Sequence, residues 1–553
     1  MGPLESAPRD GTVIEVLFDG DWYRAFWSEN AYDGSPYGTT GFAQEEENLA
    51  MVEDELEAWR FAAEKPRSYG EPSPLGGHSL RQPIVLFGLG FGDESKGATV
   101  DYLSATIPDT IAVVRWSGGV NAAHNVRHGH RHHAFRQFGS GTFLGIPTYL
   151  DEQVVVNLPM LMAEAVDLEE LGVSNPLSLI TLNGESLITT PIHMVLNRAR
   201  EILRGFDRHG STGVGIGETI VHGYAEKHDL ELGDTVGNFE IVGPPAHGDG
   251  LLTAGMLKPI GDEDLLPKLE RILELQALYA RPIIEKARAA APGLEAELDY
   301  GSTKEIAEEI LEIAQSVTIL STEDFLEKLK ELMDQGTVIF EGSQGLLLDE
   351  QWGFHPNTTW AQTEPSGIIE WLYAENHRPY VLGLTRSYMT RHGAGPLPSE
   401  YAVPLSEDSL PEDDNSWGRW QGDLRVAPLD LPLLSFARTA LRQCGVQLDG
   451  VSLSHLDAFA GEDGYPTVDG YGAQLDPSKN RHFELDGNDR FATRGSAEFL
   501  KDEVLNRAHM ISFNGKDELV GKLEERLEAP VTILARGPRR IDRELRVAPE
   551  NGN

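Results

Sequence analysis

The spacing of apolar and polar positions predicts a chain in which strands and helices alternate over most of its length. An apolar run opens Ile84–Leu103, meets a glycine-rich turn and continues with helical spacing, and Val113–Val126 is a strand followed by a Gly-Gly turn. Helices are predicted at Met160–Leu171, Ile192–Gly205 and most of Leu257–Gln335, and later strands at Thr337–Phe340, Pro379–Arg391 and Val531–Arg540. This alternation predicts an α/β fold with a mainly parallel central sheet flanked by helices, and with ligands along one sheet edge.

The first eighty residues have a different pattern. Thr12–Gly34 alternates apolar and polar positions around an Asp-Gly turn, which predicts a β-hairpin or small sheet. Glu45–Ala63 has apolar residues at helical spacing and predicts an acidic helix, and the Pro/Gly/Ser-rich segment Lys65–His78 predicts a linker. We therefore expect an N-terminal extension at 1–80, either an acidic addition or a docking module, before a main domain at 81–553.

The glycine-rich turn after Ile84 is a candidate phosphate site. Glycines let backbone N–H groups approach a phosphate closely, and Lys96 would add a positive charge. Asp93 would be repelled by a phosphate unless it held Mg²⁺ or moved a proton, so its presence suggests metal and acid–base chemistry. The alternative is a tight turn in which Asp93 caps the following helix.

Two glycine segments carry a resemblance to a known family. GDESKG (Gly92–Gly97) and GGVNAAHN (Gly118–Asn125) are similar to the GDEGKG and GGHNAGHT signatures of adenylosuccinate synthetases. Further similar segments keep the family's order, from Pro83 to Arg540: STGVGIG at 211–217, FEGSQGLLLD at 340–349, TRHGAGPLPSE at 390–400 and SHLDAF at 454–459. The resemblance implies a P-loop-like α/β ligase that joins L-aspartate to IMP at the expense of GTP, with Mg²⁺ as cofactor and a homodimer as its assembly.

The resemblance also implies roles for individual residues. Asp93 would be the base that removes the purine ring proton, His124 the partner acid, and Mg²⁺ would be held at Asp93 and Ala123. A carboxylate and an imidazole suit proton transfer near neutral pH. The implied substrate-nucleotide residues are Asn121, Thr212, Gln344 and Thr359, and Arg425 would bind the amino acid. The implied GTP residues are Gly92, Glu94, Ser95, Lys96, Gly97, His124, Asp457, Gly537 and Pro538.

The segment Trp417–Val426 departs from the family pattern. Trp420 and Gln421 fall where the family has threonines and Asp423 where it has an arginine, so Arg425 alone remains of the carboxylate-binding arginines. A ligase for another purine nucleotide, such as GMP or dGMP, or for another amino acid therefore stays open. So does a non-catalytic nucleotide-binding regulatory protein, although binding alone would not require the base.

Net charge and cysteine content exclude several kinds of binding partner and covalent cross-link. The 553 residues carry a formal net charge of −42, which argues against nucleic acid or an anionic membrane as partner. The single cysteine excludes an intramolecular disulfide. No segment is similar to a signal peptide, and no apolar run approaches the roughly 18 residues of a membrane span. We expect a cytoplasmic protein that acts on small-molecule substrates.

Overall fold

The structure is a computed structural model of the whole chain, and it forms two compact units. One comprises Met1–Pro72 with Arg438–Gln447, and the other Ser73–Ala437 with Leu448–Asn553. The predicted linker Lys65–His78 lies outside the residues that the structure describes. These are 14–18, 21–28, 41–44, 50–52, 58–61, 82–107, 109–129, 131–205, 208–227, 235–236, 239–240, 250–259, 264–403, 405, 410, 418–459, 464–471 and 509–546.

The N-terminal unit contains a five-stranded antiparallel sheet in the order β4-β3-β2-β1-β5. The predicted hairpin is confirmed, because β1 and β2 pair with Phe18 opposite Asp21. The predicted helix at Glu45–Ala63 is wrong, since this segment contributes β4 and β5, which pair with β3 and β1. Pairing to existing strands satisfies the backbone groups of so short a segment better than an isolated helix would. The strands are β1 Ile14–Phe18, β2 Asp21–Ser28, β3 Gly41–Gln44, β4 Ala50–Val52 and β5 Ala58–Phe61.

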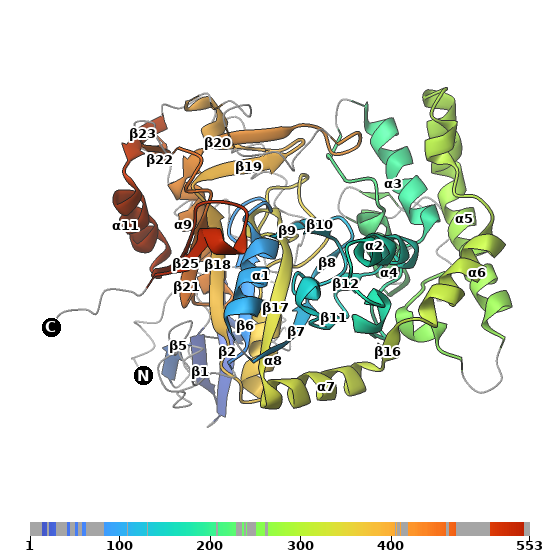
Figure 1. Cartoon of the computed structure of the whole chain (residues 1–553), viewed down its shortest axis with the longest axis horizontal. Coiled ribbons are helices and arrows are strands. Elements are labelled where there is room, and N and C mark those ends of the chain that lie inside the picture. Colours follow the sequence, from blue (N-terminus) through green and yellow to red (C-terminus); the bar gives the residue numbers. More distant parts are fainter. Residues whose placement is uncertain are drawn as a thin grey trace. The chain divides into compact units, whose positions relative to one another are not determined.

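The larger unit is built on a ten-stranded sheet, parallel throughout except for its last strand (Figure 1). Every residue of β6 and β17, two central strands, is buried, as expected of a parallel sheet covered on both faces. The predicted mainly parallel α/β fold is therefore confirmed. In spatial order the strands are β16 Thr318–Leu320, β13 Ile180–Asn183, β11 Thr148–Leu150, β7 Thr110–Arg115, β17 Thr337–Gly345, β6 Ile84–Gly88, β18 Tyr380–Arg386, β21 Gly450–Ser454, β24 Val531–Ala535 and β25 Arg543–Leu545.

Smaller sheets surround this one. The segment predicted as a single strand at Pro379–Arg391 forms two strands, because the chain leaves the central sheet at Ser387, whose backbone N–H donates to Ser454. A four-stranded sheet follows, with β19 Tyr388–His392, β20 Leu424–Asp430, β22 Tyr465–Tyr471 and β23 His509–Asn514. The two-stranded sheets are β9 His124–His128 with β10 Arg131–Phe135, β8 Gly118–Gly119 with β12 Val154–Val155, and β14 Thr235–Val236 with β15 Phe239–Glu240.

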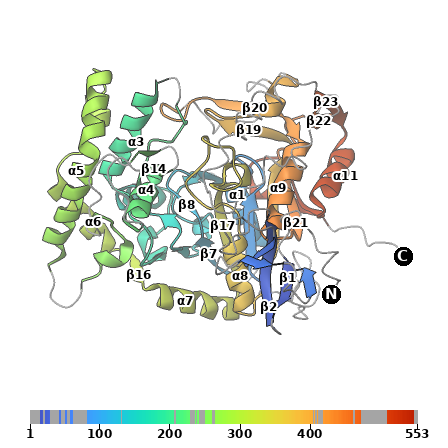
Figure 2. The same cartoon turned by 180° about the vertical axis from the view of Figure 1, so that it is seen from behind.

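A helical layer extends from one end of the central sheet (Figures 1 and 2). The predicted helices are confirmed as α2 Leu158–Glu170 and α3 Pro191–Arg204, and the long segment before β17 contains α5, α6 and α7 together with the unpredicted strand β16. Apolar residues of α2, α3, α5 and α6 share one buried cluster. The remaining helices are α1 Lys96–Thr106, α4 Ile216–Lys227, α5 Leu265–Ala290, α6 Thr303–Ala314, α7 Thr322–Gln335, α8 Ser366–Ala374, α9 Leu431–Gln443 and α11 Lys516–Leu527.

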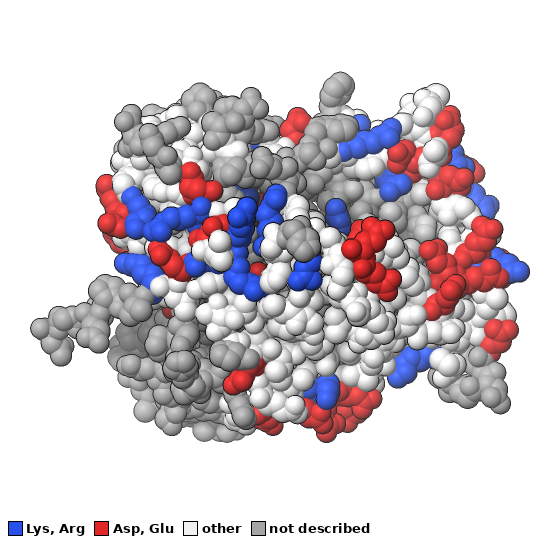
Figure 3. Space-filling model, viewed as in Figure 1, with Lys and Arg blue, Asp and Glu red and all other residues white. Residues whose placement is uncertain are grey.

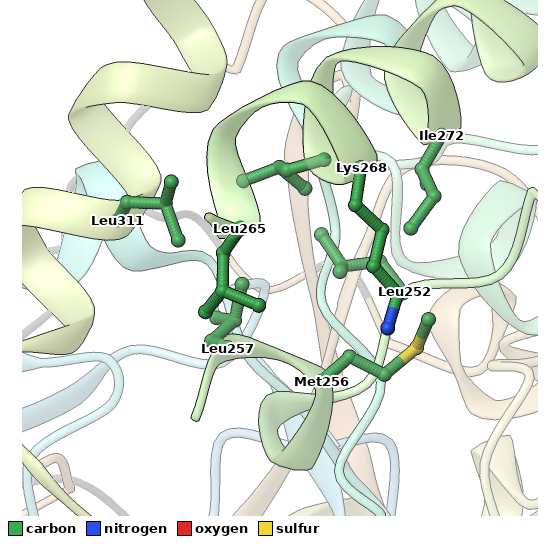
Figure 4. A pocket seen from close by; sticks show the side chains of 8 residues that line it. Leu252, Met256, Leu257, Leu265, Lys268, Ile272 and Leu311 are labelled. Carbon is green, nitrogen blue, oxygen red and sulfur yellow. The ribbon is translucent and has the colours of Figure 1, made fainter. Parts of the chain in front are cut away.

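One small hollow lies in this helical layer, at the start of α5 (Figure 4). Its volume is about 10 Å³, and seven of the eight side chains that line it are Leu, Ile or Met, with Lys268 as the exception. That space accommodates about one water molecule, so it is too small for a substrate. Over the described part of the chain, no helix combines the length and apolar character that crossing a bilayer requires.

Candidate active site

The loop between β6 and α1 is folded around a carboxylate. Oε1 of Glu94 accepts a hydrogen bond from the backbone N–H of Gly92 at 2.8 Å, and its Oε2 lies 3.3 Å from Nζ of Lys96. Lys96 also donates to the Gly92 carbonyl. A Cβ at Gly90 would come within 2.7 Å of the Glu94 carboxylate, so this glycine is required by packing as well as by any phosphate.

Asp93 does not cap helix α1. The N-cap residue is Ser95, in the left-handed conformation with φ 59° and without a side-chain cap. The Asp93 carboxylate instead lies 3.1 Å from Nε2 of His392 at the end of β19, and 29% of its side chain is exposed. Burial raises the pKa of Asp93, but His392, Arg386 and Lys96 together lower it well below its ordinary value. Asp93 is therefore an anion at neutral pH.

His124, at the start of β9, is held between two acceptors. Its Nδ1 lies 2.5 Å from Oε1 of Glu341 and its Nε2 lies 3.1 Å from the carbonyl of Ser343. Burial and Arg115 lower the pKa of His124, and Glu341 opposes them. Glu341 itself is fully buried and accepts hydrogen bonds from Ser140. Burial raises the pKa of Glu341, but His124, Arg115 and Ser140 outweigh it and lower the pKa to about 2.

A cavity of about 270 Å³ brings many of the predicted residues together. It lies where β6, β18, β21 and β24 end, as expected for a ligand site of a parallel sheet. Lys and Arg gather on the surface over α1 and β25, in contrast to the acidic balance of the whole chain (Figure 3). The lining residues are Gly92, Asp93, Ser95, Lys96, Gly97, Ala98, Ala123, His124, Asn125, Arg127, Arg386, His455, Asp457, Gly537, Pro538, Arg539 and Arg543.

Four of these lining residues are arginines that sequence reasoning missed, namely Arg127, Arg386, Arg539 and Arg543. Burial lowers the pKa of Arg543 to about 10, so it stays charged at neutral pH. The sequence pattern supplied no signal for Arg386 or Arg543, because the first lies inside the predicted strand Pro379–Arg391 and the second lies beyond the predicted strand Val531–Arg540. Together with Lys96 they make a cationic cavity that suits a polyphosphate.

Asp457 offers an acceptor to this cavity. Its Oδ1 is buried and has no hydrogen-bond partner among the described residues. Burial and Asp542 raise the pKa of Asp457, while Arg543 lowers it. The neighbouring His455 has φ 58°, and burial together with Arg386 and Arg543 holds its pKa well below the ordinary value, so it is neutral. A buried acceptor without a partner is costly unless a ligand donates to it.

None of the residues predicted for the substrate nucleotide lines this cavity. Both amide atoms of Gln344 and Oδ1 of Asn121 are buried and have no hydrogen-bond partner in the described parts of the chain. The backbone N–H of Thr359 donates a hydrogen bond to the carbonyl of Leu348. Thr212 directly precedes Gly213, and the ring of Trp420 packs against that glycine. Each of these buried amides lacks a hydrogen bond that a polar ligand can supply.

Arg425 is already engaged by its own chain. Its two terminal nitrogens donate to the Gly395 carbonyl at 2.9 and 2.8 Å, and Nε lies 3.6 Å from Glu400. Arg391, its register partner on β19, donates to the carbonyls of Ala394, Asn357 and Pro396. Both guanidinium groups therefore stabilise the turn after β19, and Arg425 would have to change partners to bind a carboxylate.

The donor set fits Mg²⁺ that is shared with a bound phosphate. Asp93 and Ala123 line the cavity, and Mg²⁺ is commonly held by one or two carboxylates plus substrate phosphates. Within the described residues, no three His, Cys, Asp or Glu side chains form a group that could hold a metal without a ligand's help.

The parallel sheet, the glycine loop and the cationic cavity define an α/β protein with a candidate ligand site at the carboxyl ends of its strands. The family model "Adenylosuccinate synthetase" matches residues 85–543, and the chain belongs to that family of carbon–nitrogen ligases. The named resemblance and the expectation of an enzyme are both confirmed.

Individual relatives agree with this assignment. The chain is 29% identical to adenylosuccinate synthetase 1 of Photorhabdus laumondii over 68% of this chain and 79% of that protein. It is 28% identical to the adenylosuccinate synthetase of Hahella chejuensis over 83% of this chain and 96% of that protein. The fold is similar to that of fully ligated adenylosuccinate synthetase from Plasmodium falciparum, with a TM-score of 0.60 and 18% identity over 84% of this chain and all of that one.

Proposed function

We propose that the protein is a GTP-dependent ligase that joins L-aspartate to IMP through a 6-phosphoryl intermediate and forms adenylosuccinate. The observation that carries this proposal is that Asp93, His124 and Lys96 line one cationic cavity together with Asp457. A base, a partner imidazole and phosphate-binding cations in one cavity are what activation of a purine oxygen by phosphoryl transfer requires. In this proposal residues 81–553 are the catalytic domain of a cytoplasmic homodimer, and 1–80 are an extension.

Asp93 would accept the purine ring proton. Its lowered pKa keeps it ionised at neutral pH, and the hydrogen bond from His392 orients the carboxylate. The purine oxygen then attacks the terminal phosphorus of GTP, and GDP leaves. The amine of aspartate displaces the phosphate in the second step. Mg²⁺, when bound at Asp93 and Ala123, supplies charge neutralisation for the phosphates.

Cationic side chains would hold the phosphoryl group during the transfer. Lys96, Arg386 and Arg543 line the cavity and carry positive charge where negative charge develops on phosphate oxygens. His124 would support the same charge from the other glycine loop if its Nε2 exchanged the Ser343 carbonyl for a phosphate oxygen, while Glu341 holds its Nδ1.

Guanine is favoured as the base of the phosphoryl donor. Asp457 presents a buried acceptor without a partner among the described residues, and the guanine edge offers two neighbouring N–H donors where adenine does not. Gly537 and Pro538 would support the base, and Gly92, Glu94, Ser95 and Gly97 belong to the phosphate loop. Asn121, Gln344, Thr212 and Thr359 would hold the purine monophosphate.

A second candidate is the same chemistry on another purine monophosphate or with another amine. One observation favours this second candidate. Arg425, the arginine predicted to bind the amino-acid carboxylate, already donates to the Gly395 carbonyl. The non-catalytic regulatory alternative is less well supported, because Asp93 and His124 lie in the same cavity as Lys96.

Phosphate release separates these candidates. The protein is incubated with Mg²⁺, GTP or ATP, L-aspartate, and IMP, GMP or dGMP. We expect release that requires both aspartate and IMP and is faster with GTP. Release with a guanine monophosphate alone would favour the second candidate, and tight nucleotide binding without any release would favour the regulatory one. An Asp457→Asn variant should lose the preference for GTP over ATP.

A further inference from the structure

The loop that departs most from the family pattern is held in place from outside the phosphate cavity. We define this divergent loop as Gly418–Asp423, immediately before β20. Both views of the chain show the β19–β20 hairpin extending to helix α3, away from the central sheet (Figures 1 and 2). At that end the loop contacts the glycine turn Ser211–Gly217 and the short helix at Glu295–Leu298, which joins α5 to α6.

The contact with the glycine turn is close. A Cβ at Gly213 would lie 2.7 Å from the indole of Trp420, so the ring packs directly on this glycine. The backbone N–H of Gly393 donates to the Asp423 carbonyl at 2.8 Å, which ties the other end of the loop to the turn after β19. The divergent loop therefore touches both the turn that contains Thr212 and the turn that Arg425 stabilises.

An ion network completes this arrangement. Oε1 of Glu297 accepts from Nη1 of Arg419 at 2.6 Å, and its Oε2 lies 3.4 Å from Nη1 of Arg198 on α3. Nε of the same Arg198 donates to the Gly213 carbonyl at 3.1 Å. Arg419 in turn lies over the ring of Trp420, with Cζ 5.8 Å from its centroid. One carboxylate from the helical layer thus connects the two loops.

The exposure of the network sets its strength. The side chain of Glu297 is 28% exposed, that of Arg198 is 22% exposed and that of Arg419 is 49% exposed. Exposed ion pairs stabilise weakly one at a time, and more when several charges form a network. A partly exposed network of this kind contributes on the order of 1 kcal/mol, which is about a fivefold change in an equilibrium and affects the position of a loop more than the folding of the domain.

We propose that Glu297 is a positioning residue that holds the divergent loop against the turn Ser211–Gly217, so that the amine-binding and nucleotide-binding segments of the site move together. This inference rests on the proposed function for the identity of the two segments. The helical layer would then contribute to binding of the second substrate, although none of its residues lines the phosphate cavity. Loss of the Glu297 carboxylate should loosen the loop and weaken binding of the amine substrate, with little effect on GTP.

Trypsin tests the loop without any assay of activity. It cleaves after arginine, so cleavage after Arg419, mapped by mass spectrometry, reports the open position of the divergent loop. We expect Glu297→Ala to speed this cleavage about two- to fivefold, in proportion to the larger open population. Glu308→Ala is the matched control, because it breaks an exposed pair with Lys304 within α6, and it should cleave at the wild-type rate. Equal rates for all three proteins would overturn the proposal.

Kinetics distinguish a positioning role from a structural one. Glu297→Ala should raise KM for the amine substrate about two- to fivefold and leave KM for GTP and the melting temperature unchanged. Arg419→Ala should do the same, and the double variant should be no worse than either single one. Equal increases in both KM values, or additive effects, would overturn the proposal. If the wild-type protein released no phosphate with any substrate, the proposed function would fail and the trypsin comparison alone would decide the role of Glu297.

Discussion

Replacing Glu341 by Gln removes one buried negative charge and keeps the size of the side chain. His124, Arg115 and Ser140 outweigh the effect of burial and lower the pKa of Glu341 from 4.5 to about 2. A lowering of that size corresponds to about 3 kcal/mol of folding free energy at neutral pH. We therefore expect Glu341→Gln to lower the free energy of unfolding by about 3 kcal/mol at pH 7, in line with the usual cost of breaking a buried pair. The activity should fall as well, because a neutral amide orients the His124 ring less strongly than the carboxylate does.

The destabilisation caused by Glu341→Gln should depend on pH. A carboxylate whose pKa is lowered on folding contributes its full stability above pH 4.5 and loses it as the pH falls through about 2. The difference between wild type and Glu341→Gln should therefore shrink to about 1 kcal/mol at pH 3. Urea unfolding followed by circular dichroism at pH 7 and pH 3 measures it, with the exposed Glu308→Gln as control. A difference that stays the same at both pH values would refute the reasoning, because the charge of Glu341 would then contribute nothing.

Three further predictions concern one residue of a glycine loop and two residues on strands β17 and β19. Gly97→Ala would place a Cβ 2.8 Å from Cβ of His124. This variant should lower the free energy of unfolding by about 1–3 kcal/mol and lose phosphate release. Wild-type stability and a wild-type rate would contradict this close packing. Gln344→Leu should raise KM for the purine monophosphate about three- to tenfold. It should not lower the melting temperature, because the amide has no partner among the described residues. An unchanged KM would show that Gln344 does not bind the nucleotide. His392→Ala should raise the pKa of Asp93 and move the acid limb of the rate profile to higher pH, whereas an unmoved limb would show that His392 does not act on Asp93.

The sequence and its family resemblance proposed candidate-site residues that lie mostly beside glycine turns. Asp93, Lys96, His124, Asp457, Gly537 and Pro538 were all expected near nucleotide phosphates or base, and all line one cavity. Strand order explains why these residues meet in one cavity, since the carboxyl ends of parallel strands lie at one edge. Local patterns failed at Glu45–Ala63, where short apolar repeats allow either a helix or strands and pairing with β1 and β3 decides.

Partners distant in the chain could not be predicted. Glu341 lies 217 residues from His124, and only the pairing of β17 with β7 and β6 brings it to the site. Glu297 and His392 likewise depend on packing between separate sheets and helices, which no local spacing encodes. A carboxylate directly after the apolar run Thr337–Phe340 was the available signal for Glu341, because a carboxylate in a buried strand requires a partner.

The central claim is that the Asp93 carboxylate removes a proton during phosphoryl transfer in the cavity that it shares with His124. Asp93→Asn keeps the size of the side chain and removes the base, so its effect on the reaction can be separated from its effect on binding. The measurement is phosphate release with Mg²⁺, GTP, IMP and L-aspartate beside the dissociation constants of both nucleotides. We predict that phosphate release is lost while both nucleotides still bind, and full phosphate release by Asp93→Asn would contradict the account.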